Sequence, residues 1–129
     1  MTEAQWDITE ADLDDLVAQV REAGQDTQEA EEIKAALSGG DVTPAEAAGV
    51  KRRLIVLALR YGGKALAWLL KHFSQEAAQY VIRHSQRLAD FLDRAENWAV
   101  DKITRFLEGC GVPVQQAQTI ARTIMAIVG

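Results

Sequence analysis

Residues 43–73 have the sequence TPAEAAGVKRRLIVLALRYGGKALAWLLKHF, and this stretch decides the fold class. Its opening is the strongest helix start in the chain, with Thr43 as the N-cap residue, Pro44 at the first helical position and Glu46 three residues after the cap. The threonine hydroxyl and the glutamate carboxylate can accept hydrogen bonds from backbone N–H groups that a helix start leaves unpaired, and proline is preorganised for the first turn. We therefore expect a long helix from residue 43.

This helix is predicted to continue to about His72, because apolar residues recur at helical spacing along it. The pair Gly62-Gly63 interrupts the pattern. Each glycine costs about 1 kcal/mol relative to alanine inside a helix, so the pair is expected to kink or split it. Phe73 and Ser74 then form a break, and Ser74 can cap the next helix.

Four further helices are predicted on either side of this stretch. Two short amphipathic helices precede it, over residues 9–23 and 27–38. One long helix follows over residues 74–108, about 50 Å in length at 1.5 Å per residue. A last helix begins at Pro113. No segment shows the strict alternation of apolar and polar residues that is typical of a strand.

These elements predict an all-α fold, a helical bundle of about five helices. The two long helices are expected to form an antiparallel hairpin, with the C-terminal helix laid against it and the acidic N-terminal two-helix segment packed on it. We divide the chain into an acidic helical segment, residues 1–42, and a cationic amphipathic bundle, residues 43–129. Four large aromatic side chains are expected in the core: Trp68, Phe91, Trp98 and Phe106.

Charge is distributed very unevenly along the chain. Residues 1–49 contain thirteen acidic and two basic residues, a net charge of −11, whereas residues 50–129 have a net charge of +6. The stretch from Val50 to Phe73 contains no acidic residue and six basic ones in addition to His72. The six are Lys51, Arg52, Arg53, Arg60, Lys64 and Lys71.

A segment that is both cationic and strongly apolar is typical of helices that lie in a membrane interface, where each basic group contributes about 1 kcal/mol at an anionic surface. This interpretation assigns lipid attraction to Lys51, Arg52, Arg53, Arg60, Lys64 and Lys71, with Trp68 as the interfacial anchor. The protein would then be a membrane-active toxin or bacteriocin-like pore former, kept soluble by its acidic N-terminal segment. In composition alone, the C-terminal region is similar to leaderless and circular helical bacteriocins.

Two simpler explanations compete with this one. The basic helix can pack its apolar side into the core while its charges pair loosely with the acidic helices, with no membrane role. The chain can also be an interaction module, binding a partner protein through the N-terminal helices or forming a homo-oligomer along the long fourth helix. The expected partner is thus an anionic membrane surface or a protein. An acidic chain with a pI near 5.0 and no helix-turn-helix spacing does not favour nucleic acid.

The sequence contains no catalytic motif, cofactor motif or metal-ligand spacing, so we expect neither an enzyme nor a metal or cofactor site. Two histidines, His72 and His84, and the single Cys110 cannot supply the four ligands of structural zinc. Gly62-Gly63-Lys64 lacks the strand, the glycine spacing and the Ser or Thr of a phosphate loop. The carboxylates Asp12, Asp14 and Asp15 lack the ligand spacing of a calcium loop and are interpreted as a solvent-facing first helical turn.

The N-terminus has early acidic residues and no apolar core, unlike a secretory signal, and one unpaired cysteine suits a reducing compartment. We expect synthesis as a cytoplasmic protein, with export possible only by a route that needs no classical signal peptide. The apolar run from Leu54 to Leu70 is interrupted by Arg60 and Lys64, and so an ordinary transmembrane helix is not predicted.

Overall fold

The computed structural model describes residues 8–39 and 43–128, and all regular secondary structure in these residues is α-helical. The prediction of an all-α protein is therefore confirmed. The helices, in chain order, are α2 (Glu10–Glu22), α3 (Gln28–Gly39), α4 (Pro44–Tyr61), α5 (Gly63–Leu70), α6 (Gln75–Arg83), α7 (Ser85–Arg94), α8 (Val100–Gly109) and α9 (Val114–Val128).

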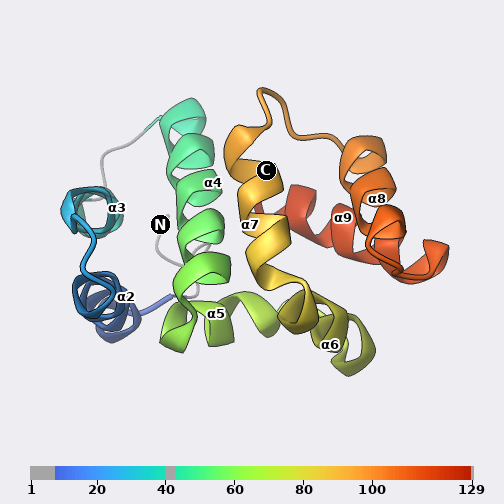
Figure 1. Ribbon diagram of the computed structural model, residues 1–129. Helices are drawn as coiled ribbons and strands as arrows, with labels where there is room; N and C mark the ends of the chain where they lie inside the picture. Colours follow the sequence, from blue (N-terminus) through green and yellow to red (C-terminus); the bar gives the residue numbers. More distant parts are fainter. Residues whose placement is uncertain (1–7, 40–42, 129) are drawn as a thin grey trace.

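Two helices, α4 and α7, lie antiparallel and side by side in the middle of the molecule (Figure 1). On one side, α2 and α3 pack against α4, and α2 also packs against α5. On the other side, α8 and α9 pack against each other, and α9 reaches back to contact α4 and α6. Figure 1 shows α5 and α6 crossing one end of the central pair. The central pair is thus enclosed from several directions.

The predicted helix starts are present where the capping residues stand. Thr43 accepts a hydrogen bond from the Glu46 backbone N–H at 3.2 Å, and the Glu46 carboxylate accepts one from the Thr43 N–H at 2.9 Å. Thr9 forms the same reciprocal pair with Asp12 at the start of α2, and Ser74 accepts from a backbone N–H at the start of α6. Local hydrogen bonds of this kind explain why these three boundaries could be predicted.

The glycine pair splits the predicted helix over residues 43–72 into α4 and α5. Gly62 has φ 76° and ψ −142°, and Gly63 has φ 71°, both in the region that residues with a Cβ rarely adopt. Two successive residues with positive φ change the direction of the chain more than a kink does. The axis of α5 therefore runs across the end of α4 instead of continuing it (Figure 1).

The prediction of one long helix over residues 74–108 is wrong. The stretch forms α6, α7 and α8, with a turn at His84 (φ −111°, ψ 21°) and a non-helical link over residues 95–99. The three helices pack against different neighbours, α6 on α9, α7 on α4 and α8 on α9, which one straight helix could not reach. In the link, Trp98 Nε1 donates a hydrogen bond to the Leu92 carbonyl at 3.0 Å. The described residues therefore form eight helices instead of about five, and the expected long hairpin is reduced to α4 with α7.

The core is centred on α4. Residues 54–59 of this helix are six consecutive buried residues, so α4 is enclosed around its whole circumference. Of the four aromatic residues expected in the core, Trp68 is buried at 2% exposure. The other three are half-buried against the core, and Phe91 and Phe106 stack with their ring centroids 4.4 Å apart.

Candidate binding surface

The seven residues predicted to bind a membrane lie on two helices, α4 and α5, and directly after the end of α5. They lie in separate surroundings, because α4 and α5 point in different directions and contact different neighbours. Arg52 and Lys71 are exposed, and Lys64 is exposed beside α2. Trp68 is buried, so in this conformation it cannot serve as an interfacial anchor.

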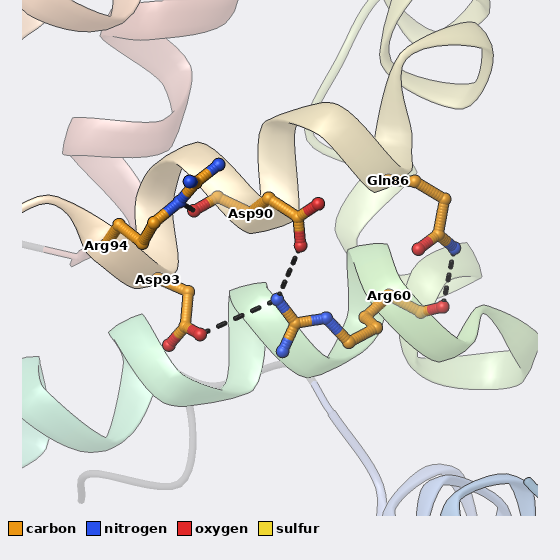
Figure 2. Close-up of polar contacts among 5 residues, drawn as sticks. All are labelled: Arg60, Gln86, Asp90, Asp93 and Arg94. Carbon is orange, nitrogen blue, oxygen red and sulfur yellow. Dashed lines mark hydrogen bonds and ion pairs between the residues drawn. The ribbon is translucent and has the colours of Figure 1, made fainter.

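Arg60 is held by α7. Its Nη2 atom lies 2.9 Å from Asp90 Oδ1 and 3.6 Å from Asp93 Oδ2 (Figure 2). Gln86 of α7 donates a hydrogen bond to the Arg60 carbonyl at 2.7 Å, where the end of α4 leaves carbonyl groups without helical partners. Arg94 donates through Nε to the Asp90 carbonyl at 3.3 Å. The guanidinium of Arg60 therefore joins the two central helices, α4 and α7.

Two further polar connections of the basic segment lead to α2 and α3, which we call the acidic cover. Arg53 Nη1 lies 3.4 Å from Glu32 Oε1 of α3, and both side chains are about half exposed. Exposed ion pairs contribute about 0–1 kcal/mol, so this pair is a weak connection. Within the cover, Lys34 of α3 forms an ion pair with Asp14 of α2 at 2.5 Å, which raises the pKa of Lys34 through the hydrogen bond to that carboxylate.

A second connection joins α2 to the start of α5. This helix begins after Gly62, which has no side chain to cap it, and its first turn contains no acidic residue. Asp15 of α2 lies there, and its Oδ2 atom accepts a hydrogen bond from the Lys64 backbone N–H at 2.9 Å. A carboxylate satisfies an unpaired N–H group and also interacts favourably with the positive end of the helix. Asp15 thus acts as an N-cap supplied by another helix.

Gly63 makes this approach possible. A Cβ atom at Gly63 would lie 2.5 Å from Asp15 Oδ2 and 3.1 Å from Cγ of Gln19, both too close for ordinary contact. The positive φ of Gly63 disfavours a side chain for a second reason. The interpretation of Asp15 as a solvent-facing residue was wrong. The Gly62-Gly63 pair was the signal in the sequence that could have indicated this contact. A helix that starts after glycine has no side chain of its own to cap it, so its first backbone N–H groups need a hydrogen-bond acceptor from another part of the chain.

An open groove with a volume of about 850 Å³ lies between the start of α4, the end of α5 and the end of α9. Its described lining residues include three basic side chains, Lys51, His72 and Arg122, and no acidic one. The remainder is mostly apolar: Pro44, Ala47, Ala48, Trp68, Thr123, Ala126, Ile127 and Val128. We call this the α9 groove. Lys51 and Trp68 were predicted from the sequence as binding residues. Arg122 was not, because it is 71 positions from Lys51 and lines the same groove only through the packing of α9 on α4.

The residues considered for catalysis or metal binding lie apart. In the part of the chain that the structure describes, no three His, Cys, Asp or Glu side chains form a group that could hold a metal ion. His72 contacts the Leu69 carbonyl through Nδ1 at 3.3 Å and packs edge-on against Trp68. Cys110 is a half-buried free thiol at the end of α8.

Across residues 8–39 and 43–128, no helix combines the length and the apolar character needed to cross a bilayer.

Comparison with known proteins gives one match. No curated protein and no solved structure matches the chain. A family model with the description "Uncharacterised protein YqxI" matches residues 47–129, which include α5 to α9 and all but the first three residues of α4. The matched range contains most of the α9 groove and leaves out the acidic cover. Since it spans well over half of the 129 residues, the chain belongs to the YqxI family.

Proposed function

We propose that this protein is a non-enzymatic helical protein that acts on anionic membranes, in the manner of a bacteriocin-like pore former, and that the acidic cover holds it in a closed form. The observation that carries the proposal is the position of α4. Its six consecutive buried apolar residues, 54–59, directly follow the basic residues 51–53 and directly precede Arg60, and the two acidic helices cover one side of it.

The middle of α4 can become membrane-active surface only if part of its enclosure moves. Leu54 to Leu59 occupy every direction around the helix axis, at 100° per residue. Displacement of α2 and α3 would therefore expose apolar side chains, and these would lie next to Arg53 and Lys64, which the cover now contacts. An apolar face flanked by cations is the arrangement that favours binding to an anionic interface.

The cover buries five apolar side chains, but its polar connections to the rest of the molecule are modest. Among the described residues these connections are the Arg53–Glu32 pair, at about 0–1 kcal/mol, and the Asp15 cap of α5, at about 1 kcal/mol. At an anionic surface the carboxylates of the cover are repelled while the basic residues are attracted, by about 1 kcal/mol for each charge near the lipid. The membrane itself would thus favour the open form.

The test is release of a trapped dye from anionic and neutral vesicles at low and high salt. We compare the full chain with the double variant Asp15→Ala/Glu32→Gln, which weakens both polar connections. We expect the variant to release dye from anionic vesicles faster than the full chain, with less effect at high salt. A shortened chain that starts at Thr43, checked for helix content by circular dichroism, is expected to be the most active.

The matched control is Asp101→Ala/Glu108→Gln, which makes the same change in charge on exposed residues of α8. This control separates loss of the cover's contacts from a general gain in positive charge. If both double variants respond alike, the acidic cover has no special role. If no form binds or leaks either vesicle type, the membrane function is wrong, and a helical protein-interaction module becomes the better proposal. Self-association would then have to use a surface other than one long helix over residues 74–108, because these residues are divided among α6, α7 and α8.

A further inference from the structure

The α9 groove combines a cationic side and an apolar floor. Positive charge comes from Lys51 on α4 and Arg122 on α9, and the imidazole of His72 after α5 lies in the same lining. The floor is formed mainly by alanines, Ile127 and Trp68. Alanine side chains leave room beside a helix, and the volume of about 850 Å³ is within the usual range for ligand pockets, about 300–1,000 Å³.

From this arrangement we propose that the α9 groove binds one anionic phospholipid molecule, with the phosphate between Lys51 and Arg122 and an acyl chain along the apolar floor. The inference rests on the proposed membrane function and names the lipid site that would serve it. A guanidinium can donate two parallel hydrogen bonds to phosphate oxygens, and an ammonium acts as a compact positive charge beside them. Two cationic side chains in the lining of one groove favour an anionic ligand.

An acidic peptide is a poorer fit than a lipid. A peptide carries N–H and C=O groups that need partners when they leave water, and most of the groove's described lining residues are apolar. An acyl chain has no such groups. The apolar floor therefore favours a ligand whose buried part is hydrocarbon.

The position of the groove also indicates when lipid would bind. None of its described lining residues belongs to α2 or α3. A phospholipid can therefore occupy the groove while the acidic cover is still in place. Binding would bring the closed protein to an anionic bilayer before the cover is displaced.

The test uses the full chain and short-chain lipids below the concentration at which they form micelles, so that no membrane is present. Dihexanoylphosphatidylglycerol is compared with dihexanoylphosphatidylcholine by NMR titration, with the Trp68 indole as a reporter inside the groove. We expect saturable binding of the anionic lipid with shifts at the start of α4 and the end of α9, and at least tenfold weaker binding of the neutral lipid.

Two substitutions test the phosphate contacts. Lys51→Gln and Arg122→Gln are each expected to weaken binding of the anionic lipid about tenfold. Lys102→Gln is the matched control, because Lys102 is exposed on α8 and is not among the lining residues. A third variant, Ala126→Leu, fills the apolar floor at an exposed helical position where leucine is well tolerated, and is expected to weaken binding without lowering the melting temperature.

The possible outcomes of these experiments are distinguishable. Equal binding of both lipids, or no binding of either, overturns the groove proposal. Binding that ignores Lys51→Gln and Arg122→Gln places the lipid elsewhere and overturns it as well. If an acidic peptide binds more tightly than the anionic lipid with the same dependence on Lys51 and Arg122, the groove is a peptide site. If the lipid binds but vesicles do not leak, the groove proposal stands and the pore-forming function is wrong. If vesicles leak but the short-chain lipid does not bind, the pore-forming function stands and the groove proposal is wrong.

Discussion

Among the described residues, the acidic cover buries five apolar side chains in two helices, whereas α4 buries seven in one. The cover's five are Leu13, Leu16, Val20, Ala30 and Ile33. Its other interactions are mostly exposed polar contacts within the cover or at its edge. Outside the cover itself, the main described neighbours of α2 and α3 are α4 and α5, while α4 has α5, α7 and α9 as further neighbours. Segments with few buried contacts open at lower free energy than the core, so the cover is the part that can leave first.

The largest expected effect comes from Leu16→Ala. Leu16 is fully buried in α2, and loss of a buried leucine costs about 2–5 kcal/mol. Leu107→Ala in α8, also fully buried, is the matched substitution on the other side of the molecule. Hydrogen exchange should become faster in α2, α3 and the start of α5 for Leu16→Ala, and in α8 and α9 for Leu107→Ala. Uniformly faster exchange in both variants would show that the cover is not a separate unit.

The next effect is that of Gly63→Ala, with an expected loss of about 1–3 kcal/mol. The new Cβ would collide with Asp15 Oδ2, and the backbone of residue 63 has a positive φ. Gly49→Ala is the control, because Gly49 lies inside α4 with no heavy atom within 4 Å of the added Cβ, and alanine should stabilise the helix by about 0.5–1 kcal/mol. Thermal unfolding measures both changes. Effects of opposite sign would support the comparison, while a neutral Gly63→Ala would mean that the Asp15 cap is dispensable.

Arg60 and Arg53 provide a smaller effect. Arg60 pairs with two aspartates of α7 in the central pair, whereas Arg53 pairs with one glutamate of the cover. We expect Arg60→Gln to lower the free energy of unfolding by about 1 kcal/mol and Arg53→Gln by less than half as much. A double-mutant cycle with Asp90→Asn isolates the interaction between Arg60 and Asp90. A larger effect at Arg53 would indicate that the cover is bound more firmly than its contacts suggest.

The smallest effect concerns Lys34 inside the cover. Its hydrogen bond to Asp14 raises the pKa of Lys34 above its ordinary value of 10.5. A raised pKa means that the contribution of the pair to stability is complete below the ordinary value and is lost as pH rises through the raised one. NMR titration of the Lys34 side chain should give a pKa above 10.5 that falls in Asp14→Asn. An unchanged titration in Asp14→Asn would mean that another group is responsible.

Some of the structure could be predicted because its cause is local. The caps at Thr9, Thr43 and Ser74 involve a side chain and a backbone N–H three residues away, and such pairs are visible in the sequence. The division at Gly62-Gly63 could also be anticipated, since glycine is the residue that tolerates positive φ. By contrast, residues 74–108 contain no glycine or proline, so nothing in their sequence marks the turns that separate α6, α7 and α8.

The sequence by itself determined the all-α class, most helix starts, and the contrast between an acidic beginning and a basic remainder. Tertiary structure alone decided which charges meet. Asp15 reaches the start of α5 across 49 positions, Arg60 joins α7 instead of facing lipid, and Lys51 shares a groove with Arg122. Helix formation depends on residues within one or two turns, whereas these contacts depend on how whole apolar helix faces pack. A turn without glycine or proline, such as the one at His84, changes which neighbour a helix face packs against, and the local sequence does not predict it.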